Sequence, residues 1–117
     1  MEPDMRQHRY EIEFYKTRSG HAPFEAWIES IRDARTVDAI VTRLARIRAG
    51  NLGDRRGLGN GIFELRFFLG PGYRIYFARP GRSLLVLLTG GSKGSQKADI
   101  EKVKVWYADY QARQEQP

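Results

Sequence analysis

Residues 62–78 read IFELRFFLGPGYRIYFA, and this stretch decides the fold. On both sides of the segment LGPG, side chains alternate with the two-residue period of a half-buried β-strand. A link this short joins antiparallel neighbours as a hairpin. We therefore predict strands at residues 62–68 and 73–78 that pair with each other.

A third strand is predicted at residues 83–89, after a short turn that contains Pro80 and Gly81. The short links indicate an antiparallel meander. Residues 84–88 read LLVLL and are apolar on both faces, which is typical of a strand inside a sheet. We expect helices to cover one side of this strand and other apolar side chains to cover the second.

The N-terminal half adds one strand and two helices. In residues 10–16 apolar side chains recur at every second position, which predicts a strand with one buried face. Pro23 is well placed to open a short helix. The inner face of that helix is expected to hold Phe24, Trp27, Ile28 and Ile31. A second helix, stopped by Gly50, is predicted from apolar residues three and four positions apart. These residues are Val37, Ile40, Val41, Leu44 and Ile47.

Residues 51–61 are predicted to form a loop, because their glycines weaken helices and strands alike. A closing helix is expected over residues 95–113, where bulky side chains fall along one stripe. The stripe consists of Ile100, Val103, Trp106, Tyr107 and Tyr110. The sequence thus predicts an α+β fold with a small antiparallel sheet of about four strands, two N-terminal helices and a C-terminal helix.

The chain has 117 residues, 41% of them hydrophobic, which fits a single domain with its own core. Residues 1–9 are interpreted as a flexible leader that lacks the apolar stretch of a secretory signal. The longest apolar run, residues 84–88, is too short to cross a bilayer. We therefore expect a soluble, cytoplasmic protein with no membrane partner.

Charge and cysteine content narrow the possible functions. Twenty Lys and Arg against fourteen Asp and Glu give a net charge of +6, which favours a polyanionic partner. The absence of cysteine excludes a disulfide framework, a thiolate nucleophile and sulfur-ligated metal sites. His8 and His21 are the only imidazoles, so a histidine zinc site or a His/His ribonuclease pair is disfavoured. We expect chemistry without a metal or other cofactor.

Charged side chains share one face of the predicted hairpin. Alternation places Glu64 and Arg66 on one face of the first strand, and Arg74 and Tyr76 on one face of the next. Arg66 and Arg74 can converge across the hairpin. An equally simple interpretation pairs Glu64 with Arg74 as an ordinary cross-strand ion pair. The sequence does not fix the register that decides between them.

Lys93 lies in the segment GGSKGSQK at residues 90–97, between the buried strand and the last helix. Backbone amides that open a helix favour an anion, and glycines permit its close approach. The segment lacks the spacing of a P-loop. It is either a phosphate site or a glycine turn with a solvated lysine.

Three segments together resemble the RelE/ParE-type bacterial toxins. They are residues 61–66 (GIFELR), residues 70–77 (GPGYRIYF), and residues 84–91 with Lys93 and Gln96. More closely, the chain resembles the HigB-like addiction module killer branch, whose members often carry Gly-Asn-x-Gly-Asp before the second strand, as residues 50–54 do. The resemblance covers about residues 10–110 and implies a small antiparallel sheet flanked by helices.

The resemblance implies the toxin of a type II toxin–antitoxin system. Such a toxin is a metal-independent endoribonuclease that cleaves mRNA, usually in the ribosomal decoding site, and is held inactive by a cognate antitoxin. The implied partners are mRNA, the ribosome and a small helix-turn-helix or otherwise helical antitoxin. By position, Arg66, Arg74 and Lys93 match the basic catalytic residues. The RNA 2′-hydroxyl attacks the adjacent phosphate, so the protein positions the strand and stabilises charge on the phosphorane.

Other residues are further candidates for the site. Glu64 stands where RelE has a lysine and is a possible acid or base. Tyr73 and Tyr76 either stack on a base or are buried cross-strand aromatics. Ser92 replaces an aspartate common in the branch, and no tyrosine occurs near Asp99, so the general acid is unassigned. Distal basic residues either bind RNA phosphates or are solvated charges. They are Arg43, Arg46, Arg55, Arg56 and Lys97.

Two other functions remain open. ParE-like members inhibit DNA gyrase without cleaving nucleic acid, and a degenerate relative would bind only an antitoxin or RNA. The basic residues at the positions Arg66, Arg74 and Lys93 favour the nuclease. Glu64 and Ser92 depart from the family pattern and favour the degenerate relative.

Overall fold

The computed structural model of the chain describes residues 9–67 and 69–115, so His8 and the predicted leader, apart from Arg9, lie outside the described residues. Five strands, three α-helices and one short 3-10 helix form this part of the chain. In chain order they are β1 (Glu11–Phe14), α1 (Pro23–Ser30), α2 (Ala34–Arg48), β2 (Arg56–Gly59), β3 (Ile62–Arg66), β4 (Arg74–Ala78), β5 (Leu84–Gly91), η1 (Lys93–Ser95) and α3 (Gln96–Gln114).

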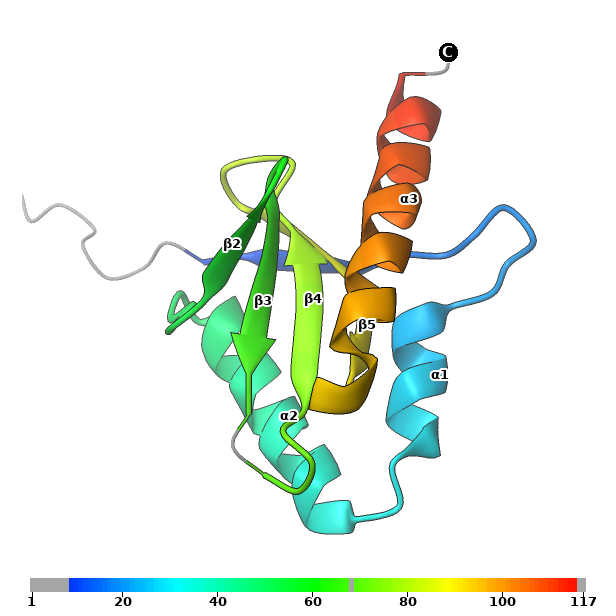
Figure 1. Ribbon diagram of the computed structural model, residues 1–117. Coiled ribbons are helices and arrows are strands. Elements are labelled where there is room, and N and C mark those ends of the chain that lie inside the picture. Colours follow the sequence, from blue (N-terminus) through cyan, green and yellow to red (C-terminus); the bar gives the residue numbers. More distant parts are fainter. Residues whose placement is uncertain (1–8, 68, 116–117) are drawn as a thin grey trace, which may run out of the picture.

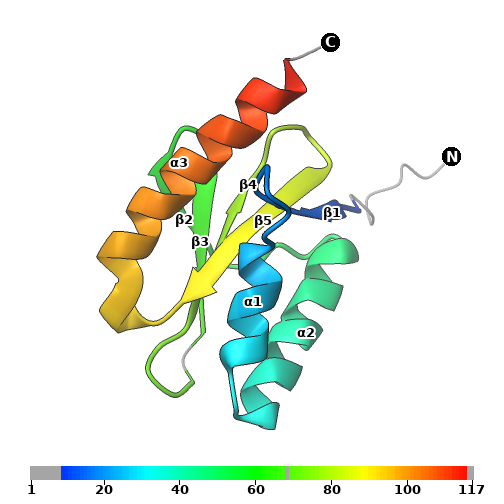
Figure 2. The same cartoon turned by 90° about the vertical axis from the view of Figure 1, so that its right-hand side faces the viewer.

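The strands form one sheet, in the order β1-β5-β4-β3-β2, between two helical layers (Figure 1). Figure 2 shows α1 and α2 against one face of the sheet and α3 against the other. Strands β2 to β5 form an antiparallel meander, and β5 lies inside the sheet as its doubly apolar sequence predicts. The α+β class and the β3–β4 hairpin are therefore confirmed.

The first strand differs from the prediction in length and direction. It spans Glu11–Phe14 instead of residues 10–16, and it runs parallel to β5 with Glu11 opposite Leu84. The sheet is therefore mixed, and the expectation of a purely antiparallel sheet is wrong. Two helices follow β1 directly, so no hairpin fixes its direction relative to a neighbour.

The glycine-rich segment contains a fifth strand, where the sequence predicted only a loop. Strand β2 forms an edge of the sheet and pairs with β3, with a register shift between Gly57 and Gly59. An edge strand tolerates glycine and irregular pairing because it is bonded on one side only. The turn into β3 passes through Asn60 and Gly61, whose φ values of 54° and 80° suit asparagine and glycine.

Two apolar cores hold the helices to the sheet. The core under α1 and α2 buries Leu65 of β3, Ile75 and Phe77 of β4, and Phe67, which follows β3 directly. The core under α3 buries Val103, Tyr107 and Tyr110 of the predicted stripe, and Ile100 and Trp106 pack against it. No helix within residues 9–67 or 69–115 is both long and apolar enough to cross a membrane.

One predicted core residue of α2 is at the surface. Ile40, Leu44 and Ile47 are buried as expected, but Val41 is 56% exposed. Val41 follows Ile40 directly, so it lies about 100° further round the helix and faces away from the sheet. Thr36 is buried instead, one turn before Ile40.

Candidate functional site

The candidate site is built on the β3–β4 hairpin, on the face of the sheet that α3 covers. The register places Arg66 directly opposite Arg74, and Glu64 directly opposite Tyr76. The two arginines therefore converge. Like charges directly opposite each other in a sheet repel, so this pair requires a compensating anion.

Glu64 supplies that anion, and its side chain has no exposed surface. Its Oε1 lies 3.1 Å from Arg66 Nε and 4.0 Å from Arg56 Nη1. Its Oε2 lies 3.6 Å from Arg74 Nε and accepts a 2.7 Å hydrogen bond from Gln96 Nε2. A buried carboxylate is costly unless it is paired and hydrogen-bonded, and both oxygens meet that condition here. Convergence of the arginines and pairing with Glu64 thus occur together.

Arg74 and Lys93 adjoin each other at the turn that precedes β4. Arg74 is 7% exposed, and its Nη1 donates a 2.9 Å hydrogen bond to the carbonyl oxygen of Gly72. Lys93 is exposed at the start of η1. A Cβ placed on Gly72 would lie 3.6 Å from Lys93 Cβ and 3.7 Å from Arg74 Nη1. Contacts thus link Arg66 to Arg74 through Glu64, whereas Arg74 and Lys93 share only the neighbourhood of Gly72.

Tyr76 lies in the interior beside this cluster. It has no exposed surface, so it offers no face to an RNA base, and the prediction that it contacts RNA is corrected. Its hydroxyl has no hydrogen-bond partner within the described residues. Burial, reinforced by the negative charges of Glu64 and Asp99, raises the pKa of Tyr76 well above its ordinary value. Tyr76 is therefore a neutral, buried cross-strand aromatic.

Asp99 is the second buried carboxylate of this face. It is 8% exposed, and its Oδ2 accepts a 2.6 Å hydrogen bond from the hydroxyl of Ser95. A Cβ on Gly91 would lie only 1.9 Å from the same Oδ2, so the glycine makes room for the carboxylate. Within the described ranges, no group of three or more His, Asp or Glu side chains is placed to share a metal ion.

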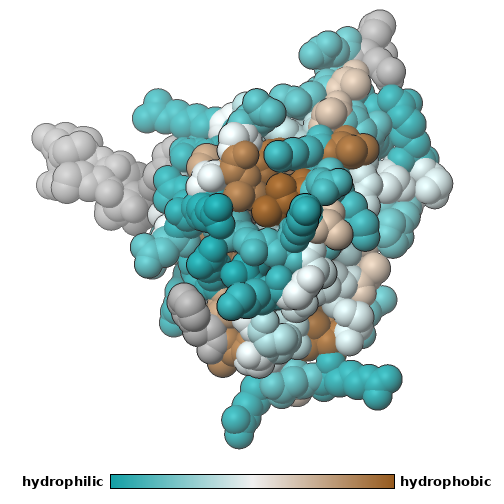
Figure 3. Space-filling model, viewed as in Figure 1, coloured by the Kyte–Doolittle hydropathy of each residue, from teal (hydrophilic) through white to brown (hydrophobic). Residues whose placement is uncertain are grey.

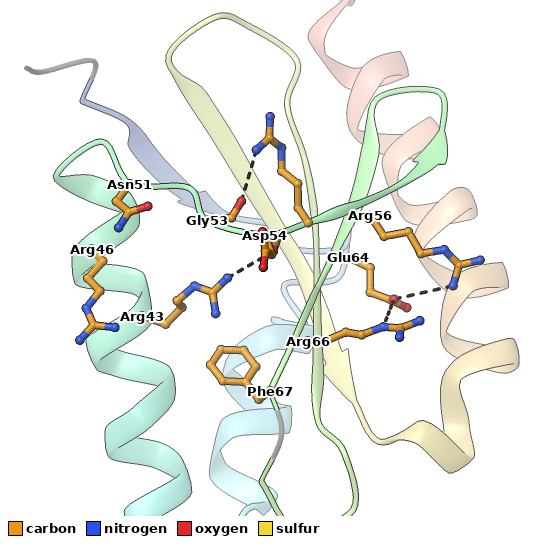
Figure 4. Close-up of a pocket in the computed structure, with 10 residues that line it drawn as sticks. Arg43, Arg46, Asn51, Gly53, Asp54, Arg56, Glu64, Arg66 and Phe67 are labelled. Atoms are coloured by element: carbon orange, nitrogen blue, oxygen red, sulfur yellow. Dashed lines mark hydrogen bonds and ion pairs between the residues drawn. The ribbon is translucent and has the colours of Figure 1, made fainter. Parts of the chain in front are cut away.

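A groove of about 690 Å³ opens beside the cluster, bordered by α2, the loop after it, β2 and β3 (Figure 4). Figure 4 shows Arg43 and Arg46 on the α2 side of β3, and Arg56 and Arg66 on its other side. Five arginines and two carboxylates make the lining basic. The lining residues are Arg43, Arg46, Asn51, Gly53, Asp54, Arg55, Arg56, Glu64, Arg66 and Phe67.

Two arginines of the groove are held against aromatic rings. Arg43 Cζ lies 5.5 Å from the centroid of the Phe67 ring, and Arg55 Cζ lies 5.7 Å from that of Phe63. Arg43 Nη2 also donates to the backbone oxygen of Asp54 at 3.3 Å. Such contacts orient a guanidinium while leaving its charge available for phosphate.

In Figure 3, hydrophilic side chains gather over the lower part of the β3–β4 hairpin, and a hydrophobic patch lies above them beside α3.

The structure therefore brings four of the predicted RNA-binding arginines, with Arg66, into one groove. Lys97 lies apart from it, exposed on α3. Tyr73 is half-buried on the opposite face of the sheet, with its ring centroid 5.9 Å from that of Trp27. Tyr73 retains some accessible surface, and its contact with RNA stays a prediction.

The sequence predicted Trp27 only as a core residue of the first helix and named Gln96 only within the family resemblance, so neither was assigned a place at the site. Gln96 lies 32 positions after Glu64, so no local spacing connects them. The ring of Trp27 packs flat on the end of β5, where a Cβ on Gly90 would come within 2.2 Å of it. A glycine at the end of an otherwise bulky strand was the available signal for such a close approach.

Comparison with known proteins yields a relative without an assigned function. The chain is 38% identical over 82 residues to an uncharacterized protein of Haemophilus influenzae, which covers 70% of this chain and 83% of the relative. No protein-family model matches the chain. No solved structure matches it significantly.

Proposed function

We propose a function for this chain, which belongs to the same family as the uncharacterized Haemophilus influenzae protein. It is a RelE/ParE-type toxin of a type II toxin–antitoxin system, an endoribonuclease that cleaves mRNA in the cytoplasm on the ribosome. The observation that carries this proposal is the pair of arginines joined by Glu64, Arg66 and Arg74, with Lys93 near the same turn and a basic groove beside them. A phosphodiester with neighbouring phosphates is the substrate that such a distribution of charge suits.

In the proposed reaction the RNA supplies its own nucleophile. The 2′-oxygen forms a bond to the adjacent phosphorus, the bond from phosphorus to the 5′-oxygen breaks, and the products carry a 2′,3′-cyclic phosphate and a 5′-hydroxyl. The proton of the 2′-hydroxyl is lost to a base, and the leaving 5′-oxygen gains one from an acid. No protein nucleophile is required, so the chain contributes orientation and stabilisation of the phosphorane charge.

Arg66 and Arg74 are suited to that stabilisation because their positions are set before substrate arrives. The side chain of Arg66 is 44% exposed, whereas that of Arg74 is 8% exposed. Arg66 is therefore held at Nε while its Nη groups are available to a substrate. Lys93 is an exposed lysine whose Cβ lies near Gly72. Glu64 has no surface that a substrate can reach, and this disfavours its predicted role as an acid or base.

The groove is proposed to hold the RNA strand that flanks the cleaved bond. Arg43 and Arg55 offer guanidinium planes already oriented on aromatic rings, and Arg46 and Arg56 extend the basic surface. The proposed antitoxin is a small helix-turn-helix or otherwise helical protein, and it inhibits by covering this groove and the hairpin face.

A second candidate, a relative that binds RNA or antitoxin without cleavage, is favoured by one observation. Arg66 and Arg74 are both already engaged by the same carboxylate, that of Glu64. A guanidinium neutralised by a carboxylate stabilises a phosphorane less than a free one does. The two candidates differ in whether mRNA is cut, so one experiment separates them.

That experiment induces the wild type, Arg74→Ala and Lys93→Ala in cells and maps RNA 5′ ends and plasmid supercoiling. Codon-phased cuts by the wild type, reduced about a hundredfold or more in each variant, support the nuclease. Lys93→Ala guards against loss of folding, because Lys93 is exposed. Lys102→Ala, an exposed cation on α3, is the matched control and should cut like the wild type.

Other outcomes point elsewhere. Intact mRNA with altered supercoiling indicates a ParE-like gyrase inhibitor, and the absence of both effects indicates the binding relative. For that relative, log affinity for RNA falls as log salt concentration rises, and Arg43→Ala should make this dependence less steep by about one.

A further inference from the structure

We infer that Glu64 is a positioning residue: it holds Arg66 and Arg74 at a fixed separation and orientation, so that a phosphodiester meets two prearranged guanidinium groups. This inference rests on the proposed function for its consequence in catalysis. Its structural part, the control of two arginines by one carboxylate, stands on the contacts alone.

The register of the hairpin brings the two arginines together. Arg66 and Arg74 are direct cross-strand partners, and side chains at directly opposite positions lie close together. Without an anion between them, two guanidinium groups at such positions turn away from each other into solvent. Arg74 has little freedom to do so, because it is 7% exposed.

Each oxygen of the Glu64 carboxylate contacts a different arginine. Oε1 accepts a 3.1 Å hydrogen bond from Arg66 Nε. Oε2 forms an ion pair with Arg74 Nε at 3.6 Å, and that Nε has no hydrogen-bond partner among the described residues. Both contacts use Nε, the nitrogen nearest the side-chain stem, and so leave the Nη ends for other partners. For Arg74, Nη1 is fixed in turn on the carbonyl oxygen of Gly72.

Gln96 orients the Glu64 carboxylate from α3. Its amide Nε2 donates to Oε2 at 2.7 Å, the shortest contact that Glu64 makes among the described residues. Gln96 is neutral and opens α3, so it orients the carboxylate without competing for charge. Gln96 on α3 thus fixes the carboxylate, and the carboxylate in turn contacts one arginine on β3 and one on β4.

The Glu64 carboxylate is not accessible to a substrate. Glu64 has no exposed surface, so it acts on a substrate only through the arginines that it contacts. A change at Glu64 should therefore alter the rate of the chemical step more than the binding of RNA. We expect the flanking strand to be bound mainly by Arg43 and Arg55, whose contacts with Phe67, Asp54 and Phe63 do not involve Glu64.

The test compares wild type with Glu64→Gln by two measurements. The first is ¹H–¹⁵N NMR of the arginine Nε–Hε groups, where we expect hydrogen exchange at Arg66 and Arg74 to become at least about tenfold faster in the variant. The second is single-turnover cleavage of a defined mRNA on ribosomes. We expect the rate to fall about a hundredfold, with less than about a threefold change in the concentration for half-saturation.

Glu101→Gln is the matched control, because it removes an exposed carboxylate from α3 and should change neither measurement. If Glu64→Gln does not fold, Gln96→Leu takes its place. Gln96 shares Oε2 with Arg74 and not Oε1 with Arg66, so this variant should perturb the Arg74 signal more than the Arg66 signal.

Unchanged arginine signals in a folded Glu64→Gln protein overturn the inference. Altered signals with an unchanged cleavage rate overturn its catalytic part. A wild type that cleaves no mRNA disproves the proposed function instead, and in that case the NMR comparison still decides whether Glu64 positions the two arginines.

Discussion

The two faces of the sheet are stabilised in different ways. Under α1 and α2 the buried side chains from the sheet are apolar, as Leu65 and Ile75 are. Under α3 the buried set includes the charged Glu64, Arg74 and Asp99. The first face depends on the apolar area that it removes from water, which many side chains share. The second combines an apolar core with buried charged groups that need specific partners, so the loss of one partner raises the cost of burying another.

The largest effect is expected from Arg74→Met, which keeps much of the side-chain volume and removes the charge. It should lower the free energy of unfolding by about 4 kcal/mol, because it takes a buried cation away from the Glu64 carboxylate. Urea denaturation measures the change. The double variant Glu64→Leu with Arg74→Met should recover much of the loss, since apolar replacement of a buried ion pair is often nearly neutral. A double variant less stable than the single one would contradict the comparison.

A slightly smaller effect is expected on the apolar face. Leu65→Ala should lower the free energy of unfolding by about 3 kcal/mol, because Leu65 is completely buried and its truncation leaves a cavity. The same denaturation measurement applies. Val41→Ala serves as the control, since Val41 is 56% exposed and its truncation should cost less than about 0.5 kcal/mol. Equal losses in the two variants would show that burial does not set the stability of this face.

The same contrast explains how much of the fold the sequence predicts. Strands β3, β4 and β5 follow from side-chain alternation and short links, which are local properties. Strand β2 was not predicted, because Gly57 and Gly59 give it no hydrophobic alternation. It forms by pairing with β3, which the local sequence does not reveal. The direction of β1 escaped for a similar reason, since it is set by contact with β5, more than seventy positions away.

The candidate site divides along the same line. Alternation alone placed Glu64, Arg66 and Arg74 on one face, and that prediction is confirmed. The sequence left open whether the arginines converge or pair with Glu64, because the answer requires the register. The contact of Gln96 with Glu64 was beyond reach, because it joins a helix to a strand through the packing of the whole α3 face.

Adjacent glycines at the end of β5 test the two faces at one point in the chain. Gly90 lies under the Trp27 ring, where a Cβ would come within 2.2 Å, and Gly91 lies under Asp99, where it would come within 1.9 Å of Oδ2. Gly90→Ala and Gly91→Ala should each cost about 2 kcal/mol through overpacking. Thermal unfolding measures both changes. When Trp27→Leu is added, the loss of stability caused by Gly90→Ala should become smaller, and the loss caused by Gly91→Ala should stay the same. A smaller loss in both cases would show that the two faces are not independent.

The smallest effect of a substitution is expected at Tyr110, one of two tyrosines that make the stability of the α3 face depend on alkaline pH. Burial, followed by a hydrogen bond donated to Glu13, raises the pKa of Tyr110 to about 12. Burial and a hydrogen bond donated to Asp109 raise the pKa of Tyr15 to about 12 as well. Both tyrosines pack in the core under α3.

Between pH 10 and 12 the unfolded chain loses these phenolic protons while the folded chain keeps them. Fewer protons are then bound by the unfolded state, so the free energy of unfolding falls as the pH rises. The stabilisation is complete below about pH 10 and is lost as the pH rises through about 12. Tyr110→Phe should cost about 1 kcal/mol at pH 8, and its stability should fall less steeply than that of the wild type between pH 10 and 12. Urea denaturation across this range measures both slopes, and parallel slopes would show that Tyr110 does not resist ionisation in the folded protein.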